Sequence, residues 1–309
     1  MPPLFPTSPQ ITVDALLKNP SVIRRALTGL TQKRFVADKI FMKGSPDQVA
    51  GGGARYQRSE AIFFDGTSPG PVEEVGIRSE FPRAGWSETL LEAAVKAYGM
   101  EFVINDLAVR RNSIDMLARG MIKLGNSIVR FVDTQAMNLI TTDANVQTFA
   151  AGGDWTTAAT DIIFDLNRAR MAIETQEEGY VADTIVVNDA QFADLINDVD
   201  IRGSLPREST DSFVQTGVLP NLLGFNVIRT SRLTAGTVLV MNAGVAGTIA
   251  DEAPSEGGYS AASTGDPGQA PIYVKQYRDE QHSDTIVRGV RWPAMWLSEP
   301  ASVVKITGA

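Results

Sequence analysis

The chain has 309 residues, of which 43% are hydrophobic and 21% are charged, and its formal net charge is −8. This composition is typical of a globular protein with room for two domains, and no run reaches the roughly 20 apolar residues of a membrane-spanning helix. The absence of cysteine excludes disulfides, thiolate catalysis and cysteine metal ligands, and the N-terminal sequence MPPLFPTSPQ lacks the charged and apolar regions of a secretory signal.

The charge is unevenly distributed along the chain. Residues 1–45 contain seven lysine or arginine residues against two aspartates, whereas residues 151–265 contain six arginines against sixteen acidic residues. A basic N-terminal segment on an acidic body favours contact with an anion, either nucleic acid or an acidic neighbour, although a solvated charged helix would have the same composition. The candidates for this contact are Arg24, Arg25, Lys33, Arg34, Lys39 and Lys43.

Residues 44–82 are rich in glycine and proline and contain two strand-like runs, Tyr56–Phe64 and Val72–Phe81, on either side of the turn-forming sequence DGTSPGP. Phe63 and Phe64 are adjacent, so a strand directs their rings to opposite faces. An isolated two-stranded hairpin is marginally stable in water and covers neither ring. We therefore predict that this hairpin packs on a surface outside itself.

A long helix is predicted to begin at Asn105 or Asp106, because either side chain can cap it and no proline interrupts residues 107–140. About 33 residues at 1.5 Å each predict a length near 50 Å. Gly120 and Gly125 within this helix favour close packing or gentle bending of the helix over a bare coiled coil. One apolar stripe is expected along it, formed by Ile114, Leu117, Met121, Leu124, Ile128 and Phe131.

After Gly153 the pattern alternates between helices and strands, which predicts an α/β domain. Residues 254–268 then have the composition of a flexible connector. The expected helices are Thr157–Gln176 and Ala190–Ile196. The expected strands are Thr184–Val187, Phe225–Arg229, Val238–Met241, Val245–Ile249, Ile272–Tyr277, Thr285–Val290 and Ser302–Thr307.

The sequence contains two weak candidates for a reactive or metal-binding site. His282-Ser283-Asp284 contains the three residue types of a hydrolase triad, but adjacent residues cannot converge on one atom, so a polar turn is the better interpretation. Residues 198–203 match part of a calcium loop, but Arg202 and Ser209 stand where oxygen ligands belong. No dinucleotide-binding or phosphate-loop glycine motif occurs. We therefore predict no catalytic residue, no metal site and no cofactor.

Three stretches together resemble the major capsid proteins of tailed bacteriophages, which share the Hong Kong 97 fold. They are VKAYGMEFVINDLAVRRNSID (95–115), TIVVNDAQFADLI (184–196) followed by GVLPNLLGFNVIRTSRLTAGTVLVMN (217–242), and RWPAMWLSEPASVVKITG (291–308). The resemblance implies an α+β fold with four parts. These are an N-terminal arm over 1–45, an extended β-hairpin loop over 46–85, a peripheral domain with a long spine helix over 86–150 and 266–309, and an α/β axial domain over 151–265.

The resemblance also implies a function. The chain is expected to be a non-enzymatic shell subunit that self-assembles into hexamers and pentamers of an icosahedral head enclosing double-stranded phage DNA. Its expected location is the virion, assembled in the cytoplasm of the bacterial host, without a membrane. The loop would lie on an adjacent subunit and the basic arm along the inner face. The loop residues expected to contact neighbouring subunits are Phe63, Phe64, Arg55, Arg58, Arg78 and Arg83.

The expected partners are other copies of the chain, a portal, packaged DNA held by non-specific contacts, and a decoration or cementing protein. The type member of the family crosslinks a loop lysine to an asparagine of the peripheral domain. Residues 46–95 contain no lysine and no asparagine follows Asn242, so non-covalent contacts are expected instead. The type member also carries a long N-terminal scaffolding segment, and because only about 40 residues precede the loop here, a separate scaffolding protein, or none, is expected.

The sequence leaves three other functions open. An encapsulin-type shell would use the same fold to package an enzyme. An α/β enzyme could use residues 46–85 as a lid, although a lid closes over polar catalytic groups and the sequence offers no such set. A phage tail or decoration protein is a third alternative, which the spine pattern and the axial-like core disfavour.

Overall fold

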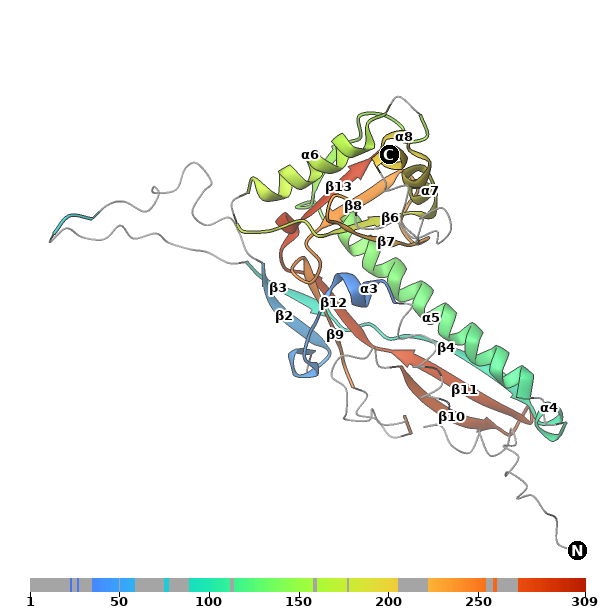
Figure 1. Cartoon of the computed structure of the whole chain (residues 1–309). Coiled ribbons are helices and arrows are strands. Elements are labelled where there is room, and N and C mark those ends of the chain that lie inside the picture. The colour runs from blue at the N-terminus through green and yellow to red at the C-terminus, as the bar shows by residue number, and fades with distance from the viewer. Residues whose placement is uncertain are drawn as a thin grey trace, which may run out of the picture.

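The computed structural model describes residues 23, 27, 35–49, 51–58, 75–77, 89–111, 114–157, 160–176, 178–204, 222–253, 258–259 and 272–309. Figure 1 shows one long helix, α5, crossing the molecule between a sheet with helices at one end and an elongated sheet along its other half. None of the described helices combines the length and apolarity needed to span a membrane.

The helical elements are α3 (Ala37–Ile40), the 3-10 turn η1 (Pro46–Val49), α4 (Asp106–Arg110), α5 (Ile114–Thr142), α6 (Ile162–Glu174), α7 (Asp189–Asn197), α8 (Val199–Ser204) and the 3-10 turn η2 (Pro300–Ser302). The strands of the first half are β1 (Met42–Lys43), β2 (Gly53–Arg58), β3 (Thr89–Ala94), β4 (Tyr98–Asn105), β5 (Gln147–Ala150) and β6 (Thr184–Val187). Those of the second half are β7 (Asn226–Arg229), β8 (Thr237–Met241), β9 (Gly247–Asp251), β10 (Tyr273–Asp279), β11 (Asp284–Arg291), β12 (Pro293–Leu297) and β13 (Val303–Thr307).

The predicted cap of the long helix is confirmed, but the helix is divided. The side chain of Asn105 accepts a hydrogen bond from the backbone N–H of Leu107 at 3.0 Å and caps the short helix α4. Helix α4 ends at Arg110 and α5 begins at Ile114, so the predicted helix forms two elements instead of one. The 29 residues of α5 span about 43 Å, somewhat less than predicted.

The apolar stripe of the spine is confirmed in its middle, where Leu124 and Ile128 are buried. The prediction for Phe131 is wrong, because half of its surface is exposed and its ring lies 5.1 Å from that of Tyr98. The buried face passes instead through Val132, Ala136, Met137 and Ile140. A straight helix drifts by about 20° per heptad against a strict 3.5-residue repeat, so the repeat cannot stay on the buried face. The side chains of Ile114 and Leu117 lie outside the described residues.

The elongated sheet has the order β10-β11-β4, all antiparallel, and α5 packs on one of its faces. The contact is close, as Gly120 predicts. A Cβ atom on Gly120 would come within 2.8 Å of the Phe102 ring on β4, and one on Gly289 of β11 would come within 2.8 Å of Leu124. The helix and the sheet therefore form one tightly packed unit.

The second sheet has the order β5-β13-β8-β6-β7 and lies between two helical layers. Its strand β6 reads TIVV and is buried along its whole length, as predicted. Apolar residues of α6 pack on one face, and the C-terminal half of α5 packs on the other. The last strand, β13, lies between β5 and β8, so the chain returns to this sheet after forming the elongated one.

The segment that contains α3 and β1 joins the body through the third sheet, in which β1 is parallel to β9 and β9 is antiparallel to β12. Strands β2 and β3 form a separate two-stranded ribbon beside β12 (Figure 1). The prediction that Val72–Phe81 forms a strand is wrong for its described residues, Val75–Ile77, which are not in a strand. The partner of β2 is β3 instead.

Candidate assembly site

The structure describes four of the predicted contact residues, namely Arg55, Arg58, Lys39 and Lys43. The others lie outside the described residues: Phe63, Phe64, Arg78, Arg83, Arg24, Arg25, Lys33 and Arg34. Arg55 is on the β2–β3 ribbon, directly opposite Glu92, and its Nε donates to the Glu92 carboxylate at 2.9 Å. Both side chains of this pair are about 70% exposed, so solvent screens it and its net contribution is small.

The base of the ribbon is anchored on strand β12. The ring of Tyr56 stacks on that of Trp296 with 5.9 Å between centroids and an interplanar angle of 25°. Around this stack a small apolar cluster joins η1, β2, β9 and β12, formed by Val49, Ala54, Ala250, Ala294 and Trp296. The backbone N–H of Lys96 also donates to the carbonyl of Pro293 at 3.3 Å. The ribbon is thus part of the body at its base.

Arg58, at the end of β2, reaches the C-terminal end of the spine helix. Its Nη2 lies 2.6 Å from the Asp143 carboxylate and 3.4 Å from the carbonyl oxygen of Leu297. Only 17% of the Arg58 side chain and 13% of that of Asp143 are exposed. Burial alone would raise the pKa of Asp143, but the Asn145 amide and the Arg58 guanidinium donate hydrogen bonds to the carboxylate and hold that pKa below its usual range. Arg58 therefore has an acidic partner within its own chain.

The N-terminal segment is anchored in the core by a buried carboxylate of the spine. Asp133 is 3% exposed, and its Oδ1 accepts hydrogen bonds from the backbone N–H groups of Val36 and Ala37, each at 3.0 Å. Burial raises the pKa of Asp133 to about 6, the Asp38 carboxylate adds to this, and the two amides and the Arg291 cation oppose it.

A second buried charge, Arg291 of β11, joins the same cluster. Its guanidinium is 1% exposed and lies 2.7 Å from Asp38 of α3 and 2.8 Å from Asp251 of β9. It also lies 4.5 Å from the ring centre of Phe35. Within the predicted arm, therefore, the segment that includes Phe35 and Asp38 packs in its own chain, as do Ile23 and Leu27. By contrast Lys39 and Lys43 are exposed.

Sequence reasoning missed this buried cluster, although one signal was available. Asp133 lies between Val132 and Ala136 on the buried face of a helix, and a carboxylate at such a position requires hydrogen-bond donors or a cation. The identity of those partners could not be inferred, because Val36 and Arg291 are far away in the sequence.

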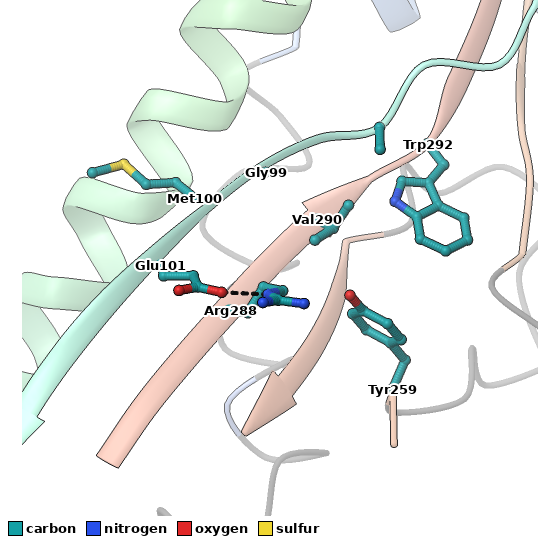
Figure 2. A pocket seen from close by; sticks show the side chains of 8 residues that line it. Gly99, Met100, Glu101, Tyr259, Arg288, Val290 and Trp292 are labelled. Carbon is teal, nitrogen blue, oxygen red and sulfur yellow. Dashed lines mark hydrogen bonds and ion pairs between the residues drawn. The ribbon is translucent and has the colours of Figure 1, made fainter. Parts of the chain in front are cut away.

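A groove of about 470 Å³ lies on the face of the elongated sheet opposite α5 (Figure 2). Glu101 and Arg288 form an ion pair across β4 and β11, and the Tyr277 hydroxyl donates to the same carboxylate at 3.0 Å. Tyr259 and Trp292 line the groove further along, with their rings in edge-to-face contact. The groove thus presents aromatic surface beside a satisfied ion pair, and its lining residues include no nucleophile next to a base.

The two weak candidates for chemistry have structural explanations. His282 lies in the turn between β10 and β11, where its Nδ1 is 2.8 Å from Asp279 Oδ2, and the hydrogen bond to this carboxylate raises the pKa of the imidazole. Asp198 accepts the backbone N–H of Ile201 at 2.8 Å at the start of α8, so this sequence forms a helix rather than a calcium loop. In the described part of the chain, no group of three or more acidic, histidine or cysteine side chains is arranged to hold a metal.

Comparison with known proteins identifies a family and a fold. A family model described as phage capsid protein matches residues 88–306. A virus-like particle from Pyrococcus furiosus has a similar structure, with 12% identity, a TM-score of 0.61 and coverage of 93% of this chain and 98% of that chain. A structure from Mycobacterium phage Che8 has 13% identity and a TM-score of 0.56, and covers 99% of this chain and 96% of that one.

The capsid of cyanophage P-SCSP1u has 11% identity and a TM-score of 0.60, with coverage of 88% of this chain and 86% of that one. Comparison with curated proteins gives no match. At these identities the structural likeness concerns the fold, and it confirms the predicted α+β fold of the Hong Kong 97 type.

Proposed function

The chain belongs to the phage capsid protein family, and from this premise we propose that it is the major capsid protein whose hexamers and pentamers form an icosahedral head around double-stranded DNA. The observation that carries the proposal is the extent of the family match, which includes the spine helix, all five strands of the second sheet and the elongated sheet. Its role is structural, and we propose no enzymatic activity. The virion is its proposed location, after assembly in the host cytoplasm.

The proposed organisation keeps the four parts expected from the sequence: the arm (1–45), the loop (46–85), the peripheral domain (86–150 and 266–309) and the axial domain (151–265). The elongated sheet supports a peripheral domain built from two separate segments, because β4 comes from residues 86–150 and β10 and β11 come from residues 266–309. Strands β6, β7 and β8 come from the axial segment. Strands β5 and β13 extend their sheet from the peripheral segments, so the two domains share hydrogen-bonded strands.

The proposed partners beyond other copies of the chain are a portal, packaged DNA, a scaffolding protein and a decoration protein. The exposed Lys39 and Lys43 support contact of the N-terminal segment with an anionic surface, through contacts that do not depend on DNA sequence.

Reversing both charges with Lys39→Glu and Lys43→Glu tests the proposed contact of the N-terminal segment with an anionic surface. Unchanged particle yield and DNA content would contradict it.

The proposal is tested by assembly of the purified protein, with its scaffolding protein if one is encoded beside it. Sedimentation and electron microscopy are expected to show closed shells, and particles from infected cells are expected to contain DNA. Boiled shells are expected to run as one band near the 33.3 kDa mass of the chain on a denaturing gel. A chain that stays monomeric under all assembly conditions, or shells that contain a protein cargo instead of DNA, would contradict the proposal.

A second prediction concerns the loop, where we propose that Phe63 or Phe64 is buried on an adjacent subunit. Truncating a buried phenylalanine costs about 3–5 kcal/mol in a core, and an interface repeated through a shell multiplies even part of that cost. Phe63→Ala is therefore expected to abolish shells while leaving the melting temperature of the monomer within about 2 °C of the original value. Phe164→Ala, at a residue 62% exposed on α6, serves as the control. A large drop in monomer stability would place the Phe63 ring in its own chain.

A further inference from the structure

The β2–β3 ribbon is held to the body by the apolar cluster around Tyr56 and Trp296 at its base, and by Arg58 at the end of β2. Tyr56 stacks on Trp296 of β12, and two residues further on Arg58 reaches Asp143 at the end of α5. One contact would leave the ribbon free to pivot about it, whereas two contacts to different elements determine its direction. Strand β2 ends at Arg58 and β3 begins at Thr89, so residues 59–88 connect the two strands of the ribbon in the sequence.

The contact between Arg58 and Asp143 joins the ribbon to an end of α5 that is itself hydrogen-bonded to the second sheet. Asp143 directly follows the last residue of α5, and the carbonyl of Thr141 in the last turn accepts a hydrogen bond from the Lys305 ammonium of β13 at 2.9 Å. Arg58 also donates to the carbonyl of Leu297 at the end of β12. The guanidinium therefore connects the ribbon to the junction of the spine helix and β12, in a place where little solvent reaches the pair.

We propose that Arg58 and Asp143 form an intrachain lock that sets the angle between the β2–β3 ribbon and the spine helix, and that assembly of the shell depends on this angle. The inference rests on the proposed function. It assigns Arg58 a different role from the one its sequence suggested, because the residue positions the ribbon within its own subunit instead of pairing with an adjacent one. Asp143 is then the second positioning residue.

The same ribbon provides a matched control. Arg55 and Glu92 form the same kind of ion pair on β2 and β3, at 2.9 Å, but both side chains are largely exposed and both strands belong to the ribbon itself. Losing this pair removes an arginine–carboxylate contact without releasing the ribbon from the body. Arg55→Ala therefore reports what the loss of an ion pair within the ribbon does to the direction of the ribbon in the monomer.

The lock is tested first in the monomer, independently of shells. The chain contains no cysteine, so Leu90→Cys on β3 and Asn138→Cys on α5 place one spin label on the ribbon and one on the spine. Both positions are exposed. We expect a narrow distance distribution that broadens at least about twofold with Arg58→Ala and is unchanged with Arg55→Ala, because only the first substitution removes a contact between two elements. Equal distributions in all three proteins would overturn the lock.

Charge exchange in assembling particles then tests where the pair forms. Arg58→Asp and Asp143→Arg are each expected to lower the yield of shells of the original size about tenfold or more, since the defect is repeated in every subunit. Both substitutions in one chain are expected to restore that yield, whereas a mixture of the two single variants is not. Restoration by the mixture would show a pair between subunits and overturn the proposal, as would Arg58→Ala shells of normal size and yield.

Failure of the proposed function and failure of the lock give different experimental results. If the unsubstituted chain forms no shells while Arg58→Ala broadens the label distances, the proposed function fails and the lock stands as a property of the fold. If the unsubstituted chain forms shells and Arg58→Ala changes neither the distances nor the shells, the lock fails and the proposed function stands.

Discussion

Replacing Arg291 with alanine is expected to lower the free energy of unfolding by about 3–5 kcal/mol, because it leaves buried carboxylates without a counter-charge. The guanidinium is 1% exposed, and it lies 2.7 Å from Asp38 and 2.8 Å from Asp251. It also covers the ring of Phe35. Its removal therefore leaves the carboxylates of Asp38 and Asp251 without a cation where the N-terminal segment, β9 and β11 meet. Urea unfolding followed by circular dichroism measures this loss.

An exposed arginine of the same sheet is the control. Arg278 pairs with Asp106 at 2.7 Å, but its side chain is 46% exposed and solvent screens the pair, so Arg278→Ala is expected to cost much less than Arg291→Ala. Arg291→Lys is expected to fall between the two, because an ammonium cannot donate in parallel to two separate carboxylates with the fixed fork of a guanidinium. If Arg291→Ala costs no more than Arg278→Ala, the cluster does not hold the N-terminal segment in place.

The elements that the sequence predicted well are those whose signal is local. Strand β6 is recognised from four consecutive β-branched residues, and the cap at Asn105 from one side chain before a long proline-free helix. Close packing of the long helix was one of the two features predicted from Gly120 and Gly125, and at Gly120 the Phe102 ring leaves no room for a Cβ atom. In each case the physical cause lies within a few residues, so one sequence is sufficient to find it.

The elements that sequence reasoning missed depend on pairing between distant residues. Strand β2 pairs with β3 across more than thirty residues, and nothing local distinguishes Thr89–Ala94 from the alternative run Val72–Phe81. Strand β12 was not predicted either, and it becomes a strand by pairing with β9. Arg58 was predicted to pair with an acidic residue of an adjacent subunit because it lies in the expected extended loop, and its intrachain partner Asp143 is 85 positions away. Such pairs require the three-dimensional structure.

The raised pKa of Asp133 makes the stability of the protein depend on pH. Its pKa is raised from the ordinary value of 3.8 to about 6, chiefly by burial. The folded state therefore binds the proton more tightly than the unfolded state does. The corresponding stabilisation is fully present below about pH 4 and is lost as pH rises through 6, and it amounts to about 3 kcal/mol. The charged groups that face Asp133 are Asp38 of α3 and Arg291 of β11.

Asp133→Asn is expected to remove this pH dependence, because the amide stays neutral while its oxygen can still accept the N–H groups of Val36 and Ala37. At pH 8 the variant is expected to be about 2–3 kcal/mol more stable than the unsubstituted chain, and below about pH 4 the two should converge. Urea unfolding from pH 4 to 8 measures the difference, with Asp47→Asn in the exposed turn η1 as the control. Hydrogen exchange of the amides of residues 35–41 locates the effect, since deprotonation of Asp133 should accelerate exchange there before elsewhere. Parallel stability curves for the variant and the unsubstituted chain would show that Asp133 does not titrate in this range.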